Sequence, residues 1–231
     1  MAIKNNLLEI RSSLPEGVRL VAVSKFHSAE TIRQAYDAGQ RIFGESRVQE
    51  LIAKQPALPD DIEWHFIGTL QTNKVKFIVP FISMIQSVDS LKLIKEIDRQ
   101  AGLNNKIIKV LIEVHIAEEE SKHGFSPDEC EALFTNEVQQ YPNIQVCGLM
   151  GMATFTDDAK QVSREFAMLN NLYNEIKSMP STDKQMFTEL SIGMSDDYKI
   201  AIENGSTMIR VGTAIFGEKK ASPQPPPIEG E

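Results

Sequence analysis

A lysine follows directly after an apolar, β-branched run near the start of the chain. Lys25 comes after Arg19-Leu-Val-Ala-Val-Ser24, whose composition predicts a buried strand. Apolar surroundings at a strand end favour a neutral amine, and a neutral lysine can form a Schiff base with a carbonyl compound. A lysine in this position can equally mark only the point where the strand reaches solvent.

Two glycine-containing segments in the last third of the chain could bind a phosphate group. The first is Ser191-Ile-Gly-Met-Ser195, in which Gly193 allows a ligand to approach the backbone and Ser195 offers a hydroxyl. The predicted helix after it would carry Asp196 and Asp197 in its first turn, and its unpaired N–H groups could contact the anion. These two acidic residues could equally stabilise the helix dipole with no ligand present.

The second segment is Ile209-Arg-Val-Gly-Thr213, at the end of a predicted strand. Side chains alternate along a strand, so Arg210 and Gly212 are expected on the same face. In (β/α)8 barrels, a phosphate is commonly held by the loops after the seventh and eighth strands. Together with Lys25, the two segments favour a ligand that carries both an aldehyde and a phosphate.

Short apolar strands alternate with amphipathic helices along the chain. Strands are predicted at residues 19–24, 41–43, 64–67, 84–87, 109–114, 145–150, 188–191 and 208–211. Helices are predicted at residues 1–11, 28–38, 45–55, 72–79, 90–102, 127–139, 157–177 and 196–204. Ser28 and Ser90 fit helix N-caps, and Gly39 and Gly102 fit helix ends.

This alternation predicts parallel strands joined by right-handed helical crossovers. Eight such units predict an α/β protein with a single-domain (β/α)8 TIM-type barrel over residues 1–218, opened by an N-terminal helix. An open, doubly wound sheet is the main alternative. Residues 219–231 are polar and proline-rich, so we expect a flexible, disordered tail without a domain of its own.

The composition restricts the class of function. The 231 residues include 32 acidic and 24 basic ones, which argues against a nucleic-acid partner. No signal peptide and no apolar run of ~18 residues is evident, so no membrane partner is expected and the cytoplasm is the predicted location. Cys130 and Cys147 lack the spacing of a metal or redox motif and are expected to be small, buried apolar residues. No metal site is predicted.

The sequence resembles the YggS/PROSC family of pyridoxal phosphate homeostasis proteins, whose fold is similar to the barrel domain of bacterial alanine racemase. The resemblance covers residues 7–218 and rests on several segments that occur in the family's order. They are Ala22-Val-Ser-Lys25, Phe43-Gly-Glu45 with Val48-Gln-Glu50, Trp64-His-Phe-Ile-Gly68 with Leu70-Gln-Thr-Asn-Lys74, Glu119-Glu-Ser-Lys-His-Gly-Phe125, Gly148-Leu-Met150, Glu189-Leu-Ser-Ile-Gly-Met-Ser195 and Arg210-Val-Gly-Thr213.

The resemblance implies that pyridoxal 5′-phosphate (PLP) is bound as an aldimine on Lys25. It also implies a set of phosphate-binding groups: Ser195, Gly212, Thr213 and the backbone of Gly193 and Met194. Arg210 would face the pyridine nitrogen. Because a guanidinium does not give up its proton, that nitrogen would stay unprotonated and the ring would be a weak electron sink.

The remaining cofactor-binding residues implied by the resemblance are Ser46, His65, Met150 and Ser191. His65 could equally be a structural, hydrogen-bonded histidine, and no residue is expected to be catalytic. Two positions depart from the family pattern. Ser46 stands where an asparagine is common, and His115 replaces an asparagine, where it could add a titrating group to the pocket or turn outward.

The favoured function is a monomeric PLP carrier that serves PLP (vitamin B6) homeostasis and amino-acid balance, with apo PLP-dependent enzymes as partners. One alternative is a PLP-dependent racemase-like enzyme, which by resemblance needs a second β-rich domain supplying a tyrosine. No such domain is expected here, and the tyrosines lie in or beside predicted helices: Tyr36, Tyr141, Tyr173 and Tyr198. A Schiff-base aldolase acting on a sugar phosphate is a further alternative, which would lack the near-visible absorbance of bound PLP.

Overall fold

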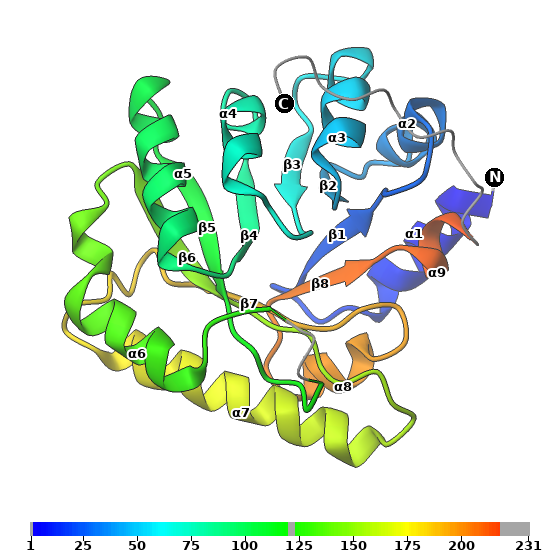
Figure 1. Cartoon of the computed structure of the whole chain (residues 1–231). Coiled ribbons are helices and arrows are strands. Elements are labelled where there is room, and N and C mark those ends of the chain that lie inside the picture. The colour runs from blue at the N-terminus through cyan, green and yellow to red at the C-terminus, as the bar shows by residue number, and fades with distance from the viewer. Residues whose placement is uncertain (1, 120–122, 218–231) are drawn as a thin grey trace.

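The computed structural model describes residues 2–119 and 123–217 and contains a closed barrel of eight parallel strands (Figure 1). Each strand pairs with the next along the chain, and β8 pairs with β1. The strands are β1 Arg19–Val23, β2 Ile42–Glu45, β3 Glu63–Phe66, β4 Met84–Val88, β5 Ile108–Glu113, β6 Ile144–Met150, β7 Glu189–Ser191 and β8 Met208–Val211. The predicted barrel is confirmed, and the open doubly wound sheet is excluded.

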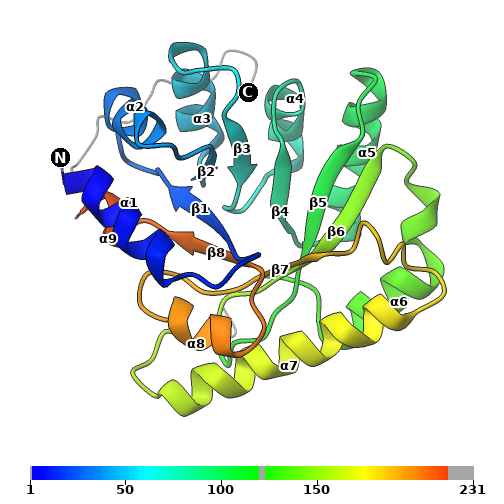
Figure 2. The ribbon, with the colours of Figure 1, turned by 180° about the vertical axis from the view of Figure 1, so that it is seen from behind.

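The helices lie around the outside of the barrel, as Figure 1 and the view from behind in Figure 2 show. The α-helices are α1 Ala2–Ser13, α2 Ala29–Asp37, α3 Val48–Lys54, α4 Val75–Ile78, α5 Leu91–Leu103, α6 Pro127–Asn136, α7 Ala159–Ser178, α8 Tyr198–Glu203 and α9 Thr213–Phe216. Short 3-10 helices are η1 Gln55–Ala57, η2 Thr72–Lys74 and η3 Val138–Gln140. Because α6 ends at Asn136 and is followed by η3, the predicted helix to residue 139 is too long by one turn.

Most of the predicted helix caps form. The Ser28 hydroxyl accepts the Thr31 N–H at 3.3 Å, and the Ser90 hydroxyl accepts the Leu93 N–H at 3.3 Å. Gly39 adopts a φ of 92° just after α2, where a residue without a side chain is favoured.

The predicted cap at Gly102 is wrong. Helix α5 continues to Leu103, and the left-handed residue that follows it is Asn105, with a φ of 51°. Asparagine tolerates this conformation better than most residues. The absence of a side chain at Gly102 leaves room for Asn143, because a Cβ there would lie 3.0 Å from the side-chain nitrogen of Asn143.

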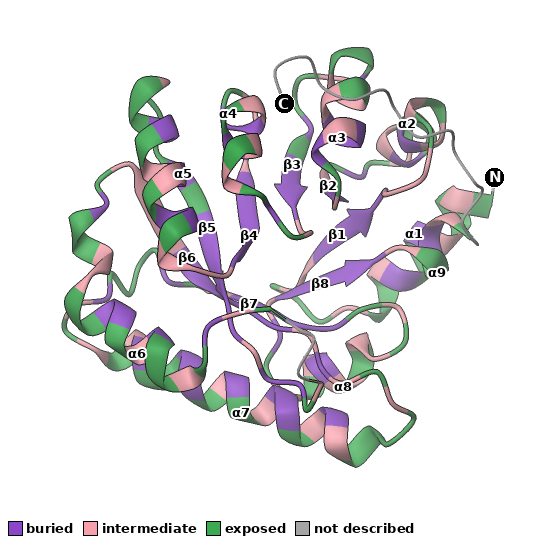
Figure 3. Cartoon of the chain, viewed as in Figure 1, coloured by how far each residue is buried: buried purple, intermediate pink, exposed green. Residues whose placement is uncertain are grey.

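Alternation along the strands separates two apolar cores. The outer core lies between the strands and the helices and contains Trp64, whose ring centroid is 6.0 Å from that of Phe43. Trp64 therefore packs between the barrel and the helices. The inner core fills the barrel and consists of Val21, Met84, Leu111, Cys147, Met150 and Met208. Figure 3 shows the strands mostly buried and the helices exposed on their outer sides.

Within the described residues, 2–119 and 123–217, no helix is both long and apolar enough to cross a membrane. The predicted tail at 219–231 lies outside the described residues, as do the domain boundary at 218 and the middle of the Glu119–Phe125 segment.

Candidate functional site

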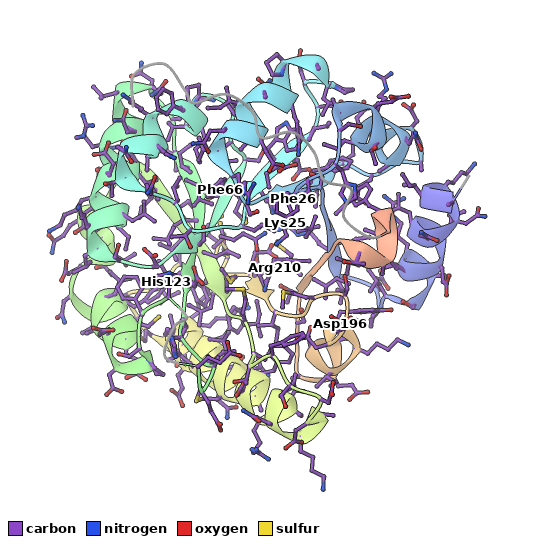
Figure 4. All side chains as sticks on the ribbon, turned by 45° about the vertical axis from the view of Figure 1, so that its right-hand side comes forward. Lys25, Phe26, Phe66, His123, Asp196 and Arg210 are labelled. Atoms are coloured by element: carbon purple, nitrogen blue, oxygen red, sulfur yellow. The ribbon has the colours of Figure 1, made fainter. Side chains whose placement is uncertain are left out.

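Lys25 lies one residue beyond Ser24 at the carboxyl end of β1, which is the end where ligands bind in barrels of this type. Its strand pairs with β8, and Val21 stands opposite Arg210 in that pairing. In the view of Figure 4, the labelled Lys25 lies above the labelled Arg210. Lys25 is half-buried after β1 and Arg210 is almost fully buried on β8, so two cationic side chains come from adjacent strands.

The two predicted phosphate segments meet in space. The Gly212 N–H donates to the Ser195 hydroxyl at 3.3 Å, which joins the loop after β8 to the loop after β7. A Cβ on Gly212 would lie 3.2 Å from the carbonyl oxygen of Val23, so this loop also packs closely against the end of β1. The structure thus brings Ser195, Gly212 and the strand that precedes Lys25 together.

Glycine at position 193 is required by the protein's own packing. Its φ is 94°, in the left-handed region, and a Cβ would lie 2.6 Å from that of Ala201. The following helix, α8, begins at Tyr198, so the prediction that Asp196 and Asp197 form its first turn is wrong. Asp197 instead accepts the Met194 N–H at 2.5 Å and closes the loop before the helix.

A buried chain of hydrogen bonds crosses the barrel interior below Lys25. Arg210 donates from one guanidinium nitrogen to both the carbonyl and the hydroxyl oxygen of Ser191, each at 2.7 Å. Its other terminal nitrogen donates to the Gly151 carbonyl at 3.0 Å. The Ser191 hydroxyl lies 2.7 Å from Gln86 Oε1, and Gln86 Nε2 lies 2.8 Å from His65 Nδ1.

The direction of this chain follows from arginine being only a donor. Because Ser191 accepts from Arg210, its own proton points to Gln86 Oε1, which leaves Gln86 Nε2 to donate to His65. His65 Nδ1 is therefore an acceptor, and the ring is neutral. Burial, assisted by the positive charges of Arg19 and Lys109, lowers the pKa of His65 to about 3.

These contacts give His65 and Ser191 definite structural roles. Both are almost fully buried in the hydrogen-bond chain. Direct contact of either residue with a cofactor stays a prediction. Gln86, which links them, was not anticipated, although a polar Gln86-Ser87 pair at the end of an apolar strand was a visible signal.

Arg210 stays protonated at neutral pH. Burial lowers its pKa to about 10, opposed by the negative charges of Asp197 and Glu113. Glu113, at the end of β5, is a second residue that the sequence analysis missed. Burial raises its pKa to about 7, the charge of Asp89 adds to this effect, and Arg210 opposes it. Its signal was an acidic residue inside the apolar run of residues 109–114.

The other predicted site residues lie at the same end of the barrel. Met150 is buried in the inner core at the end of β6, and Ser46 is half-buried directly after β2. Thr213 is exposed at the start of α9. Met194 is 37% exposed and, with the loop of residues 152–157, lines a cleft of about 620 Å³.

The cysteines do not add a reactive group to this site, and whether the His115 side chain enters it stays a prediction. His115 is half-buried, and its N–H donates to the Phe125 carbonyl at 2.9 Å. Cys130 and Cys147 are buried free thiols, as predicted. Burial raises their pKa values to about 12 and about 11, which makes them poor nucleophiles. Among the described residues, no group of three or more His, Cys, Asp or Glu side chains could hold a metal ion.

Comparison with known proteins gives consistent matches. Residues 1–220 match the family described as alanine racemase, N-terminal domain. The pyridoxal phosphate homeostasis protein of Aquifex aeolicus is 40% identical over 203 residues, which are 87% of each chain.

Solved structures extend the comparison. The structure of PipY from Synechococcus elongatus with PLP bound is similar, with a TM-score of 0.83 and 39% identity over 93% of this chain and 100% of that chain. An alanine racemase from Clostridium difficile has a TM-score of 0.72 at 14% identity, over 93% of this chain and 55% of that one. This last likeness shows the fold alone.

Proposed function

Because this chain belongs to the family of pyridoxal phosphate homeostasis proteins, we propose that it binds PLP and takes part in intracellular PLP (vitamin B6) homeostasis and amino-acid balance. The observation that carries the proposal is the hydrogen bond between Gly212 and Ser195, which joins two loops beside the strand that precedes Lys25. This contact supports a site in which the Lys25 amine and several N–H and hydroxyl groups suited to a phosphate lie at one end of the barrel.

We place the covalent contact at Lys25. Its Nζ would attack the aldehyde carbon of PLP, and loss of water would leave a Schiff base, the aldimine. The Gly193–Met194 backbone, Ser195, Gly212 and Thr213 would hold the phosphate. Ser46, His65, Met150 and Ser191 complete the proposed cofactor-binding residues.

Arg210 would donate a hydrogen bond to the pyridine nitrogen. Three of the five N–H groups of an arginine are bound here to Ser191 and Gly151, which holds the guanidinium in one orientation. A protonated guanidinium at that position does not supply a proton to the ring, so the ring would stabilise a carbanion poorly.

We therefore propose a PLP carrier and regulator without PLP-enzyme turnover, acting as a monomer in the cytoplasm and serving apo PLP-dependent enzymes. Relatives described as pyridoxal phosphate homeostasis proteins support this choice over a racemase-like enzyme. The barrel shared with racemases supports the alternative only at the level of the fold.

Turnover distinguishes the two functions. We expect PLP-loaded protein to leave single-enantiomer alanine unracemised and to show no appreciable transaminase or decarboxylase activity, while reactivating a PLP-dependent apo-enzyme. Chiral chromatography of the amino acid and the regained activity of the apo-enzyme measure the two outcomes. Sustained turnover that disappears in Lys25→Ala would establish the enzyme instead.

The phosphate contacts can be tested by removing single hydroxyl groups. Ser195→Ala and Thr213→Val are each expected to weaken PLP binding, because a hydrogen bond to a charged acceptor contributes about 1.5–3 kcal/mol. This corresponds to roughly tenfold or more in the dissociation constant, measured by equilibrium dialysis. Wild-type affinity in the double variant would place the phosphate elsewhere.

A further inference from the structure

Two carboxylates and an ammonium form a buried cluster behind the strand end that carries Lys25. Glu45 lies at the end of β2, and Glu50 and Lys54 lie on α3. Lys54 Nζ donates to Glu45 Oε1 at 2.8 Å and to Glu50 Oε2 at 3.0 Å. The exposed fractions of these side chains are 0% for Glu45, 7% for Glu50 and 11% for Lys54, so the cluster is shielded from solvent.

The cluster binds the residues on both sides of Lys25. The Ser24 hydroxyl donates to Glu45 Oε1 at 2.7 Å, and the Ser24 carbonyl accepts from Lys54 Nζ at 3.2 Å. The Phe26 N–H donates to Glu50 Oε2 at 2.9 Å. Lys25 lies beyond the last residue of β1, so these contacts fix its backbone where the strand has ended.

Phe26 adopts a conformation that needs such support. Its φ is 68°, in the left-handed region, which is unfavourable for a bulky residue. The hydrogen bond to Glu50 satisfies its N–H, and the Arg47 guanidinium lies 4.7 Å from the centre of its ring. A guanidinium nitrogen of Arg47 also lies 3.6 Å from Glu50 Oε1. Glu50 therefore contacts both the Phe26 N–H and the arginine that lies over the Phe26 ring. Figure 4 shows Phe26 next to Lys25 at the barrel mouth.

Glu50 is suited to this task because it is ionised. Burial raises its pKa, but the Phe26 N–H, Lys54 and Arg47 outweigh burial and bring the pKa below its ordinary value. A carboxylate is a stronger acceptor for a backbone N–H than a neutral group is. Glu45 differs, since burial raises its pKa against the opposing effects of Lys54 and Ser24.

We propose that Glu50, held by Lys54 and Glu45, is a positioning residue that keeps Phe26 in its left-handed conformation and thereby directs the Lys25 amine toward the cofactor. The inference rests on the proposed function only for the identity of the cofactor. The cluster acts through the backbone of residues 24–26 and is not itself a contact of PLP.

Two substitutions of Glu50 test its hydrogen bond to the Phe26 N–H. Glu50→Ala removes the acceptor for the Phe26 N–H, whereas Glu50→Gln keeps an acceptor oxygen of the same shape. Ile97→Val in the outer core on α5 is the control for a general loss of stability. Thermal unfolding confirms first that each variant is folded.

Two measurements report on the conformation of Phe26 and the position of the Lys25 amine. The first is hydrogen exchange of the Phe26 amide, measured by NMR in protein without PLP. The second is the rate at which added PLP gives a borohydride-trapped adduct on Lys25, measured by mass spectrometry. We expect Glu50→Ala to speed exchange and to slow adduct formation by about tenfold or more. Glu50→Gln should have a smaller effect, because it keeps the acceptor oxygen but loses the charge, and Ile97→Val should leave both rates unchanged.

Wild-type rates of exchange and adduct formation in Glu50→Ala would overturn the inference, as would an equal loss in Ile97→Val. If the wild-type protein itself forms no adduct, the proposed function fails. The inference is then decided by Phe26 exchange and by the NMR signal of the Lys25 ε-methylene group. A changed signal in Glu50→Ala supports it, and an unchanged signal overturns it.

Discussion

Replacement of Lys25 by alanine is expected to abolish the near-visible absorbance of the PLP-loaded protein and the adduct trapped by borohydride. The reason is chemical, because alanine has no amine to bond to the aldehyde and borohydride reduces only a carbon–nitrogen double bond that has formed. The fold should persist, since Lys25 lies beyond β1 and outside both apolar cores. Absorbance before and after borohydride, followed by peptide mapping, measures the result.

Lys95→Ala provides the matched control for this experiment. Lys95 is an exposed lysine on α5 and is not among the proposed cofactor-binding residues. It should keep wild-type absorbance and the adduct on Lys25. An adduct mapped to Lys74 or Lys122 in the wild-type protein would show that the assignment to Lys25 is wrong.

Glu113→Gln is expected to stabilise the protein at alkaline pH. The Glu113 carboxyl has its pKa raised from 4.5 to about 7 in the folded protein, chiefly by burial. Between these values the folded state binds more protons than the unfolded state, so its contribution to stability falls as pH rises through that window. The difference corresponds to roughly 3 kcal/mol, at 1.36 kcal/mol for each pH unit. Glutamine resembles the protonated acid and does not ionise.

The measurement is urea unfolding of wild type and variant at pH 4 and pH 8.5, without PLP. We expect similar free energies of unfolding at pH 4 and a gain on the order of 3 kcal/mol for the variant at pH 8.5. Glu131→Gln on α6 is the control for loss of one negative charge, with no expected gain. A difference between wild type and Glu113→Gln that does not change with pH would contradict a buried carboxyl titrating near neutrality.

The barrel could be predicted because its signals are local and repeat eight times. Each apolar strand is followed by a helix, and caps such as Ser28 and Gly39 mark where helices begin and end. The site was predicted in outline for the same reason, since Lys25 and the two glycine-containing loops all follow directly after strands. Closure of the barrel then brings the first and eighth strands together.

Features that depend on contacts across the barrel could not be predicted. Gln86 acquires its role only because β3 and β7 place His65 and Ser191 within reach of it. Glu50 and Lys54 were visible as a helical pair, but their contacts with Phe26 and Ser24 require the packing of α3 against the end of β1. Nor does the sequence around Gly102 show Asn143, which lies in a different segment.

The hydrogen-bond chain from Arg210 to His65 also limits how this barrel could acquire carbanion chemistry. Such chemistry calls for an acid at the pyridine nitrogen, and a carboxylate in place of Arg210 would accept where the guanidinium donates. Ser191 would then have to turn its proton toward position 210, Gln86 would have to exchange its oxygen and nitrogen, and His65 would have to move its proton to Nδ1. A single substitution would thus leave two acceptors facing each other in the barrel interior. The donor and acceptor roles along these hydrogen bonds, from residue 210 to His65, therefore stay as they are or reverse together.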